Sequence, residues 1–399
     1  MKIEWNGSLL NNEMLFVVYL FVFAAIKPVL LISDHSSMIL LIATAIIILA
    51  SLPGTALTYN KDNLGRFAIT ILLISGLIAF DMLFRPNSIQ GTVPYNFLIY
   101  GIIPLYLLIN VQDFRRVLIY YCCFSIFVAC MYLKDPFLGY RWSSNYMQFA
   151  FSAMLPGFSG AVLAVCVFKK RICILFMILF AIELLLYGNK SAIISAAILG
   201  IMIYYTTTDK NMRSYVLMAS ILLVVLLVMN FNSILNLIGN MLGKTGAYSY
   251  SLTTLFLLFS GNGKTVTSSR LDIWVDAWDI FLKSPIIGHG TVYFEGLSKS
   301  ESGYAHNLVL DLMVSYGIMA LLILIPFIIR TFYRAFKASD FYLRMTLILF
   351  ITLSLVPMTF SLTFWKTSNF WILVGLVIYR FDTALNHGGE YEEDISANL

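Results

Sequence analysis

Two side chains in the C-terminal third of the chain could act together on a phosphate-bearing molecule. Arg270 lies in the run 268–274 (SSRLDIW), and His306 lies where apolar sequence resumes after a long polar stretch. A guanidinium is a planar fork of donors that can bind two phosphate oxygens, and an imidazole can remove a proton from a hydroxyl group near neutral pH. Taken alone, a solvated arginine and a structural histidine are the alternatives, so the two are candidate catalytic residues.

Lys190 is a second candidate cation. It follows the turn-forming pair Gly188-Asn189 and stands at the expected N-terminal end of an apolar helix. The free N–H groups of a helix N-terminus already favour an anion, so a cation at this position does not stabilise the helix itself. Lys190 either binds a phosphate group or simply extends its side chain into water.

Two polar residues after His306 are candidate supporting groups. Asn307 can orient a hydroxyl group of a bound molecule. Asp311 lies one helical turn later and can hold the amide of Asn307.

The composition indicates that these residues belong to an integral membrane protein. The chain has 399 residues, of which 60% are hydrophobic and 12% are charged, whereas soluble domains carry about 25% charged residues. Apolar runs of about 20 residues recur along the whole length, which is typical of membrane-spanning helices. No polar stretch is long enough to form a separate soluble domain.

The apolar pattern predicts an all-α, polytopic fold in which residues 1–399 form a single membrane domain. Twelve transmembrane helices are expected, near 14–32, 38–53, 67–84, 94–110, 115–133, 149–168, 172–187, 191–207, 214–231, 305–330, 343–361 and 368–381. The first is expected to be an uncleaved span, because no signal-peptide cleavage pattern follows it. Residues 232–304 then form one large loop between the ninth and tenth spans, and residues 382–399 form an acidic tail.

The distribution of positive charge predicts the orientation. Most Lys and Arg residues fall in the segments that share a side with the two termini. By the positive-inside rule, this side is the cytoplasm. The large extracytoplasmic loop then lies on the outer side, together with Arg85, Lys134, Arg141, Lys190 and Lys366.

Ionisable residues inside the spans require partners, because hydrocarbon penalises them. Asp81 lies four residues before Arg85, and we expect the two to pair on one helix near the outer surface. Glu183 lies seven residues before Lys190. It either neutralises a cationic pocket or is a protonated structural carboxyl.

The large loop is expected to contain an amphipathic helix that begins next to Arg270. Ser269 and Asp272 have the spacing of a helix-capping pair, which makes Arg270 the first helical residue. The aromatic residues of the helix gather on one face, at Trp274, Trp278 and Phe281. We expect the helix to lie flat on the outer membrane surface with this face down.

Short motifs in this order carry a resemblance to a known family. They are 269–274 (SRLDIW), 284–290 (SPIIGHG) and 305–307 (AHN), the last of which leads to 316–318 (YGI). With about a dozen spans and one large outer loop late in the chain, they resemble the O-antigen polymerase and O-antigen ligase superfamily of bacterial membrane glycosyltransferases.

The resemblance implies an inverting, metal-independent transfer between glycans linked to undecaprenyl diphosphate, on the outer face of the plasma (inner) membrane. The family's loop arginine corresponds to Arg270, and its histidine corresponds to His306 as the general base. Its second arginine corresponds to Lys190, which keeps the charge but lacks the bidentate fork. Arg270 and Lys190 are then expected to bind the diphosphate, without a cofactor or a metal ion.

Three functions remain to be distinguished. We favour a polymerase that joins the lipid-linked repeat units into O-antigen, capsule or exopolysaccharide, because the run 269–274 and the turn 188–192 (GNKSA) resemble those of such polymerases. An O-antigen ligase, which transfers glycan to lipid A core, is the alternative within the family. A polysaccharide or lipid transporter (flippase) is the alternative from another class, although transporters commonly show two related halves and no internal repeat is visible here.

The expected partners are the lipid-linked glycan donor and acceptor and the membrane lipids. A chain-length regulator and a flippase are candidate protein partners. The net charge of +5 is explained by the positive residues on the cytoplasmic side, so no nucleic acid is expected to bind.

Overall fold

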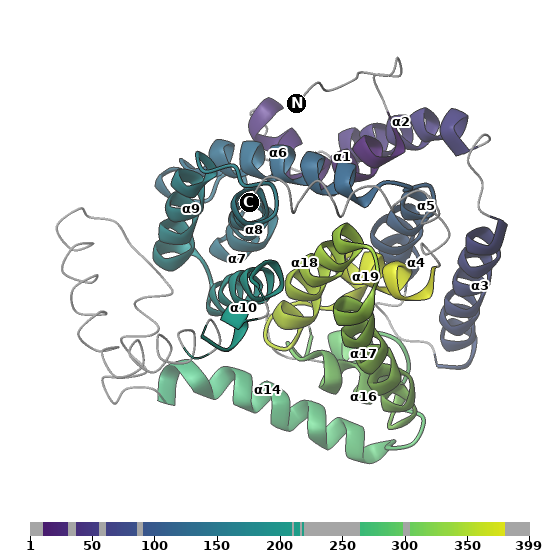
Figure 1. Ribbon diagram of the computed structural model, residues 1–399. Coiled ribbons are helices and arrows are strands. Elements are labelled where there is room, and N and C mark those ends of the chain that lie inside the picture. The colour runs from purple at the N-terminus through teal and green to yellow at the C-terminus, as the bar shows by residue number, and fades with distance from the viewer. Residues whose placement is uncertain are drawn as a thin grey trace.

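The computed structural model describes residues 11–30, 37–55, 61–85, 91–209, 211–215, 218, 264–297 and 304–379. Every regular element within these residues is a helix, which confirms the all-α prediction (Figure 1). Residues 219–231 of the expected ninth span, residues 232–263 of the large loop and the tail at 382–399 lie outside the described residues.

The first eight expected spans are all present as helices. They are α1 (Asn12–Leu30), α2 (Ser37–Thr55), α3 (Lys61–Phe84), the run of α4 (Thr92–Asn96), η1 (Phe97–Ile102) and α5 (Ile103–Ile109), α6 (Phe114–Tyr132), the run of α7 (Tyr146–Phe149), η3 (Ala150–Met154) and α8 (Leu155–Cys166), α9 (Cys173–Tyr187) and α10 (Lys190–Thr207). Over all described residues, seven helices are long and apolar enough to cross a membrane, and four shorter apolar helices accompany them. The chain is therefore a polytopic membrane protein.

Two of these spans contain a π-helical stretch, and a proline explains each. Pro104 directly follows the start of α5, and Pro156 follows the start of α8. A proline lacks the N–H group that would bond one turn earlier, and its ring displaces the carbonyl group there. The preceding turn widens into η1 or η3, and the span continues through the proline.

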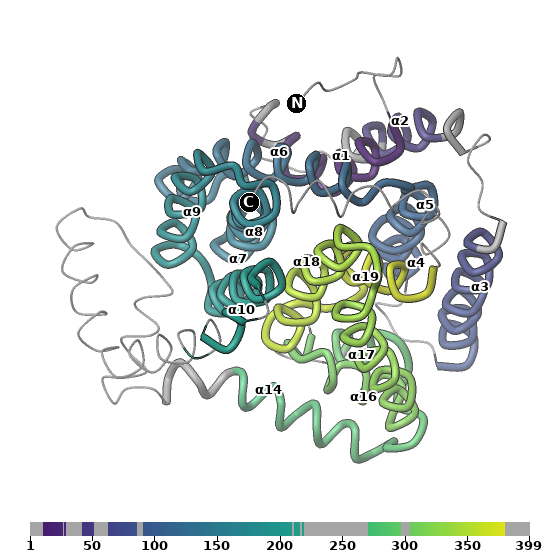
Figure 2. Tube along the Cα trace, in the orientation of Figure 1, coloured from purple at the N-terminus to yellow at the C-terminus, as the bar shows by residue number. Residues whose placement is uncertain are grey.

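The C-terminal helices include the most deeply buried of the candidate spans. They are α14 (Lys264–Lys283), α15 (Tyr293–Leu297), α16 (Leu308–Tyr316), α17 (Met319–Lys337), α18 (Phe341–Met358), η4 (Phe364–Lys366) and α19 (Ser368–Ile378). α18 is buried along almost its whole length and packs against α10, α17 and α19 (Figure 2). Its hydroxyl groups bond to carbonyl oxygens one turn earlier, so they are satisfied inside the core.

The prediction of one continuous span at 305–330 was wrong. Gly317 has a φ of +66° and ends α16, and α17 begins at Met319. This left-handed conformation favours glycine. A Cβ atom at Gly317 would also overlap the carbonyl oxygen of Ile286. The helix breaks because the segment 284–290 approaches its backbone, so α17 alone is the candidate span.

Candidate active site

Arg270 lies inside α14 and not at its first residue. α14 begins at Lys264, after the last helix-breaking residues, which are the glycines at 261 and 263. The expected start next to Ser269 was therefore wrong, because the residues between Lys264 and Arg270 include no glycine or proline that would stop the helix. Arg270 and Trp274 are four residues apart and share one side of α14.

Trp274 links α14 to the segment that carries the histidine. Its indole Nε1–H donates a hydrogen bond to the carbonyl oxygen of Ala305 over 3.1 Å. Ala305 immediately precedes His306. Arg270 lies one helical turn before Trp274, so its guanidinium lies near the imidazole of His306. The two groups interact electrostatically.

The expected aromatic face of α14 is divided between two environments. Trp274 and Phe281 pack toward α16, in a small apolar core that also contains Ile273 and Ala277. Trp278 is 47% exposed, and its ring lies 5.3 Å from the ring of Phe281. The aromatic residues therefore share one face of α14 as predicted, but α16 covers part of this face. The placement of α14 on the membrane surface stays a prediction.

His306 is held in a buried and strained conformation. Its φ is +52°, which costs a residue other than glycine on the order of 1–3 kcal/mol. Its ring lies 4.2 Å from the ring of Tyr304, and its Nδ1 lies 3.4 Å from the carbonyl oxygen of Ser361. The hydroxyl of Tyr304 donates to the same oxygen over 2.6 Å. A proton on Nδ1 faces this oxygen, which leaves the lone pair of Nε2 for proton transfer.

Electrostatics keep this imidazole neutral. Burial, together with the positive charge of Arg270, lowers the pKa of His306 to about 4. The neutral form is the one that a general base requires. An anion bound to Arg270 offsets the charge of the guanidinium, so it raises the pKa of His306 toward the range in which a base is most effective.

Lys190 enters the site from the N-terminus of α10. The side chain of Asn189 caps the helix by accepting from the N–H of Ala192 over 2.7 Å, so Lys190 is the first helical residue, as predicted. The hydroxyl oxygens of Ser191 and Ser361 lie 2.8 Å apart. The turn after α18 is therefore part of the site. Ser361 was missed because a serine between two apolar runs gives no functional signal.

The two cations of the site, Lys190 and Arg270, lie close together. Arg270 interacts electrostatically with Lys190, Tyr304 and His306. Both cationic side chains are only partly exposed. No carboxylate within the described ranges forms an ion pair with either of them. Like charges that repel each other in this way favour the binding of a ligand with two negative charges.

The two supporting residues fix the segment around His306. The side-chain oxygen of Asn307 caps α16 by accepting from the N–H groups of Val309 and Leu310, over 3.0 and 3.2 Å. Asp311 is buried and accepts a hydrogen bond of 3.1 Å from the hydroxyl of Thr363. The bond that the structure gives Asp311 therefore ties α16 to the turn before α19, in place of the expected bond to the Asn307 amide.

Glu183 lies on α9, away from any ion pair. Its Oε2 atom is buried and has no hydrogen-bond partner among the described residues. The spacing of Glu183 and Lys190 allowed a loose interaction between them. No ion pair within the described residues joins the two.

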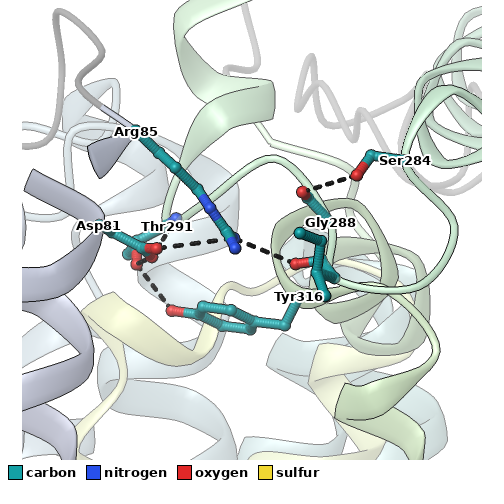
Figure 3. Close-up of polar contacts among 7 residues, drawn as sticks. Asp81, Arg85, Ser284, Gly288, Thr291 and Tyr316 are labelled. Atoms are coloured by element: carbon teal, nitrogen blue, oxygen red, sulfur yellow. Dashed lines mark hydrogen bonds and ion pairs between the residues drawn. The ribbon is translucent and has the colours of Figure 1, made fainter.

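A second polar cluster, which we call the α3 clasp, consists of Asp81, Arg85, Thr291 and Tyr316 (Figure 3). Asp81 accepts from the N–H of Thr291 over 2.8 Å and also from its hydroxyl, which lies 2.7 Å from the hydroxyl of Tyr316. Arg85 lies 3.8 Å from Asp81, which confirms the expected pair, and donates to the carbonyl oxygen of Ile287 over 3.1 Å. The α3 clasp thus attaches α3 to the segment between α14 and α16.

Backbone pairing joins the same segment to the end of α16. Four hydrogen bonds run between the two: from His289 to Val314, Gly290 to Ser315, Ile318 to Pro285 and Met319 to Ile286. Gly288 has a φ of +69°, and a Cβ atom there would overlap the backbone of Ser315. The motifs 284–290 and 316–318 are therefore in direct contact, which fixes α14 relative to α16.

The segments that the sequence assigns to one side of the membrane do come together. Arg85, Lys190, Arg270 and the turn at 359–367 belong to this group, and the contacts described above join them. Arg66, assigned to the opposite side, donates to the carbonyl oxygen of Ile378 at the far end of α19, over 2.8 Å. The two groups occupy opposite ends of the helices.

Comparison with known families agrees with this arrangement. Residues 175–325 match the family model described as O-antigen ligase, and no curated protein matches the chain. The matched segment includes Lys190, Arg270 and His306. Members of this family are glycosyltransferase-like enzymes whose substrates are lipid-linked glycans. Residues 175–325 of this chain are therefore similar to the O-antigen ligase family, which is consistent with the O-antigen ligase and polymerase superfamily that the motifs indicated.

Proposed function

We propose that this protein is a polymerase that joins undecaprenyl-diphosphate-linked oligosaccharide repeat units into a surface polysaccharide. One observation carries the proposal: Lys190 and Arg270, two adjacent cations, lie beside the neutral imidazole of His306. The family match to residues 175–325 supports it, because all three residues fall within the matched segment.

The cations bind the diphosphate of the donor. Arg270 offers a planar fork to two phosphate oxygens, whereas Lys190 acts as a point charge. The N-terminus of α10 adds its free N–H groups to the same anion-binding region. Two side-chain cations then stabilise the charge that develops on the leaving diphosphate, and the transfer requires no metal ion.

His306 activates the acceptor. Its Nε2 removes the proton of an acceptor hydroxyl, and the oxygen forms a bond to the anomeric carbon of the donor sugar. The bond between this carbon and the diphosphate oxygen breaks on the opposite face, so the configuration inverts. Undecaprenyl diphosphate leaves with the electron pair and later takes up a proton.

The topology assigned from the charges places this chemistry on the outer face of the bacterial plasma (inner) membrane, with both termini in the cytoplasm. Residues 232–304 are then the extracytoplasmic loop, and the donor and acceptor lipids enter from the bilayer. A flippase supplies the lipid-linked units to this face, and a chain-length regulator is a candidate partner.

An O-antigen ligase is the second candidate function, because the matched family carries that description. The same three residues would perform the same chemistry, and only the acceptor would differ. A polymerase uses another lipid-linked unit as acceptor, whereas a ligase uses lipid A core.

Replacement of the site residues in cells tests the proposal. We expect cells with only Arg270→Ala or His306→Ala to accumulate single repeat units on undecaprenyl diphosphate at the outer face. Arg116→Ala is the control, because Arg116 is exposed and pairs with Asp113 at the start of α6. Full-length polymer from both site variants would contradict the proposal.

Two other outcomes identify the alternatives. Accumulation of long lipid-linked polymer that is not attached to lipid A core would indicate a ligase. Accumulation of lipid-linked units on the cytoplasmic side would indicate a transporter.

A further inference from the structure

The carboxyl group of Glu183 lies in a place where it needs a ligand or a partner. Glu183 belongs to α9, an apolar helix, and stands one turn before its end. Its Oε2 atom is buried without a hydrogen-bond partner among the described residues. Such a group costs free energy unless a donor reaches it, and an ionisable residue in a membrane helix is a functional candidate for this reason.

Aromatic side chains surround this carboxyl group. Tyr187 lies four residues after Glu183 on the same face of α9. The ring of Phe137, from the turn between α6 and α7, packs edge-on against the ring of Tyr187 at 5.7 Å. Tyr140 belongs to the same turn, and its ring packs against Phe149 at 5.9 Å.

The turn between α6 and α7 is built around a fixed, strained backbone. Tyr140 has a φ of +59° and Ser144 a φ of +66°, conformations that cost a residue other than glycine on the order of 1–3 kcal/mol. Asp135 maintains the turn by accepting from the N–H groups of Trp142 and Ser143, over 2.8 and 3.1 Å. Strain of this kind gathers at functional sites, where it holds a side chain in a required position.

The turn that carries Tyr140 touches the face of α9 that carries Glu183, through the contact of Phe137 with Tyr187. Burial, together with the charges of Tyr187, Asp135, Glu183 and Tyr146, raises the pKa of Tyr140 to about 12. Tyr140 therefore lies near the carboxyl group on α9 and near Tyr146 at the start of α7.

The row of phenol groups continues to the catalytic centre. Tyr146 interacts with Tyr304, and the ring of Tyr304 lies 4.2 Å from the ring of His306. The phenols thus connect the surroundings of His306 with those of Glu183.

This combination of groups is suited to a sugar. A phenol ring offers an apolar face to the C–H groups of a pyranose, and its hydroxyl both donates and accepts hydrogen bonds. A carboxylate accepts from sugar hydroxyls, and such a bond would satisfy the buried oxygen of Glu183. The cationic pair of Lys190 and Arg270, by contrast, is suited to the diphosphate.

We infer that Glu183, Tyr140, Tyr146 and Tyr187 form a saccharide-binding subsite that holds sugar residues of the lipid-linked glycan next to His306. This inference rests on the proposed function and adds that two separate groups of residues bind two different parts of the substrate. The cations bind the part of the substrate that all lipid-linked units share. The phenols and the carboxyl group bind the part that differs between glycans, so this subsite determines which glycan is accepted.

Binding of two probes to the purified, full-length protein tests the inference. Farnesyl diphosphate carries the diphosphate and no sugar, whereas the undecaprenyl-diphosphate-linked repeat unit from the host carries both. We expect Glu183→Gln and Tyr140→Phe each to weaken binding of the repeat unit about tenfold, the size of one lost hydrogen bond to a charged group. Neither should change the affinity for farnesyl diphosphate, which also shows that the variants are folded.

Tyr204→Phe is the matched control, because Tyr204 is 53% exposed on α10, and it should bind both probes normally. Unchanged affinity of Glu183→Gln and Tyr140→Phe for the repeat unit would overturn the inference. An equal loss of affinity for both probes would overturn it as well, because that result indicates a general change of structure.

A third variant separates this inference from the proposed function. Arg270→Ala should weaken the binding of farnesyl diphosphate. If it does not, the proposed diphosphate site is wrong, whereas the effect of Glu183→Gln on the repeat unit still decides whether the subsite exists.

Discussion

Two polar clusters on the same side of the molecule differ in whether their charges have partners of opposite sign. In the α3 clasp, the buried carboxylate of Asp81 faces a guanidinium and accepts from a backbone N–H and a hydroxyl. In the proposed catalytic centre, Lys190 and Arg270 lie close together beside a buried imidazole. No carboxylate of the described residues pairs with either cation there.

The difference separates stability from function. In the α3 clasp the carboxylate has its countercharge and donors within the protein, so the cluster lowers the free energy of the folded state. Under the proposed function, the cations of the proposed catalytic centre are neutralised only when an anion binds, so their repulsion raises the free energy of the unliganded protein. The α3 clasp and the backbone pairing of 284–290 hold α14 and α16 in place, and this frame keeps the repelling cations close together.

The largest effect should come from removing a residue of the catalytic centre. We expect His306→Ala to slow glycan transfer about 100- to 10,000-fold, the usual contribution of a general base, and Arg270→Ala about 100- to 1,000-fold, as for other groups that stabilise transition-state charge. Arg270→Ala should not lower the melting temperature, since it removes a repulsion. Transfer rates in proteoliposomes and thermal unfolding of the same samples measure both quantities. A fall in melting temperature that parallels the loss of rate would contradict the separation.

Removal of the carboxylate from the α3 clasp should mainly affect stability. We expect Asp81→Ala to lower the free energy of unfolding by about 2–3 kcal/mol, because it removes hydrogen bonds to a charged group and leaves Thr291 without its acceptor. Asp81→Asn should cost less, since an amide oxygen still accepts. Arg116→Ala is the control, because its pair with Asp113 is exposed and contributes about 0–1 kcal/mol. Equal melting temperatures for Asp81→Ala and Arg116→Ala would show that the α3 clasp adds nothing to stability.

A third comparison concerns glycines within and outside the frame. Gly288→Ala and Gly317→Ala should each destabilise the protein by more than about 1 kcal/mol, because both positions have positive φ and a Cβ atom would overlap backbone. Gly200→Ala in α10 meets nothing within 4 Å and should stabilise the helix by about 0.5–1 kcal/mol. Thermal unfolding of the three variants measures these changes. If Gly200→Ala lost stability while Gly288→Ala and Gly317→Ala did not, the close approach of the backbone at 284–290 to the end of α16 would be wrong.

The smallest effect is a dependence of stability on pH. The pKa of His306 in the folded protein is lowered to about 4, from 6.5. Between these values the unfolded chain binds a proton that the folded chain does not, so the contribution of His306 to stability is lost as the pH falls from 6.5 to 4. His306→Gln should weaken this dependence in thermal unfolding measured across the range. An identical pH profile in the variant would mean that His306 is not buried in its neutral form.

Local patterns in the sequence were sufficient for the features that local physics determines. The Gly-Asn turn correctly placed Lys190 at the start of α10, and the spacing of Asp81 and Arg85 correctly predicted their pair. The charge distribution also grouped the segments that meet around the site.

Features that depend on distant segments could not be predicted. Gly317 looked like any glycine in an apolar run, and the break there is required by the backbone of 284–290. Thr291 and Ser361 are small hydroxyl residues whose partners, Asp81 and Ser191, are far away in the sequence. No local pattern marks such residues.

The most direct test of the central claim is the pKa of His306 with and without a bound diphosphate, measured by NMR on protein with labelled histidine and assigned with His306→Gln. We predict a pKa near 4 in the free protein and a clear rise when farnesyl diphosphate binds, because the anion offsets the charge of Arg270. A pKa that stays unchanged while farnesyl diphosphate is bound would mean that the cations and the imidazole do not share one site.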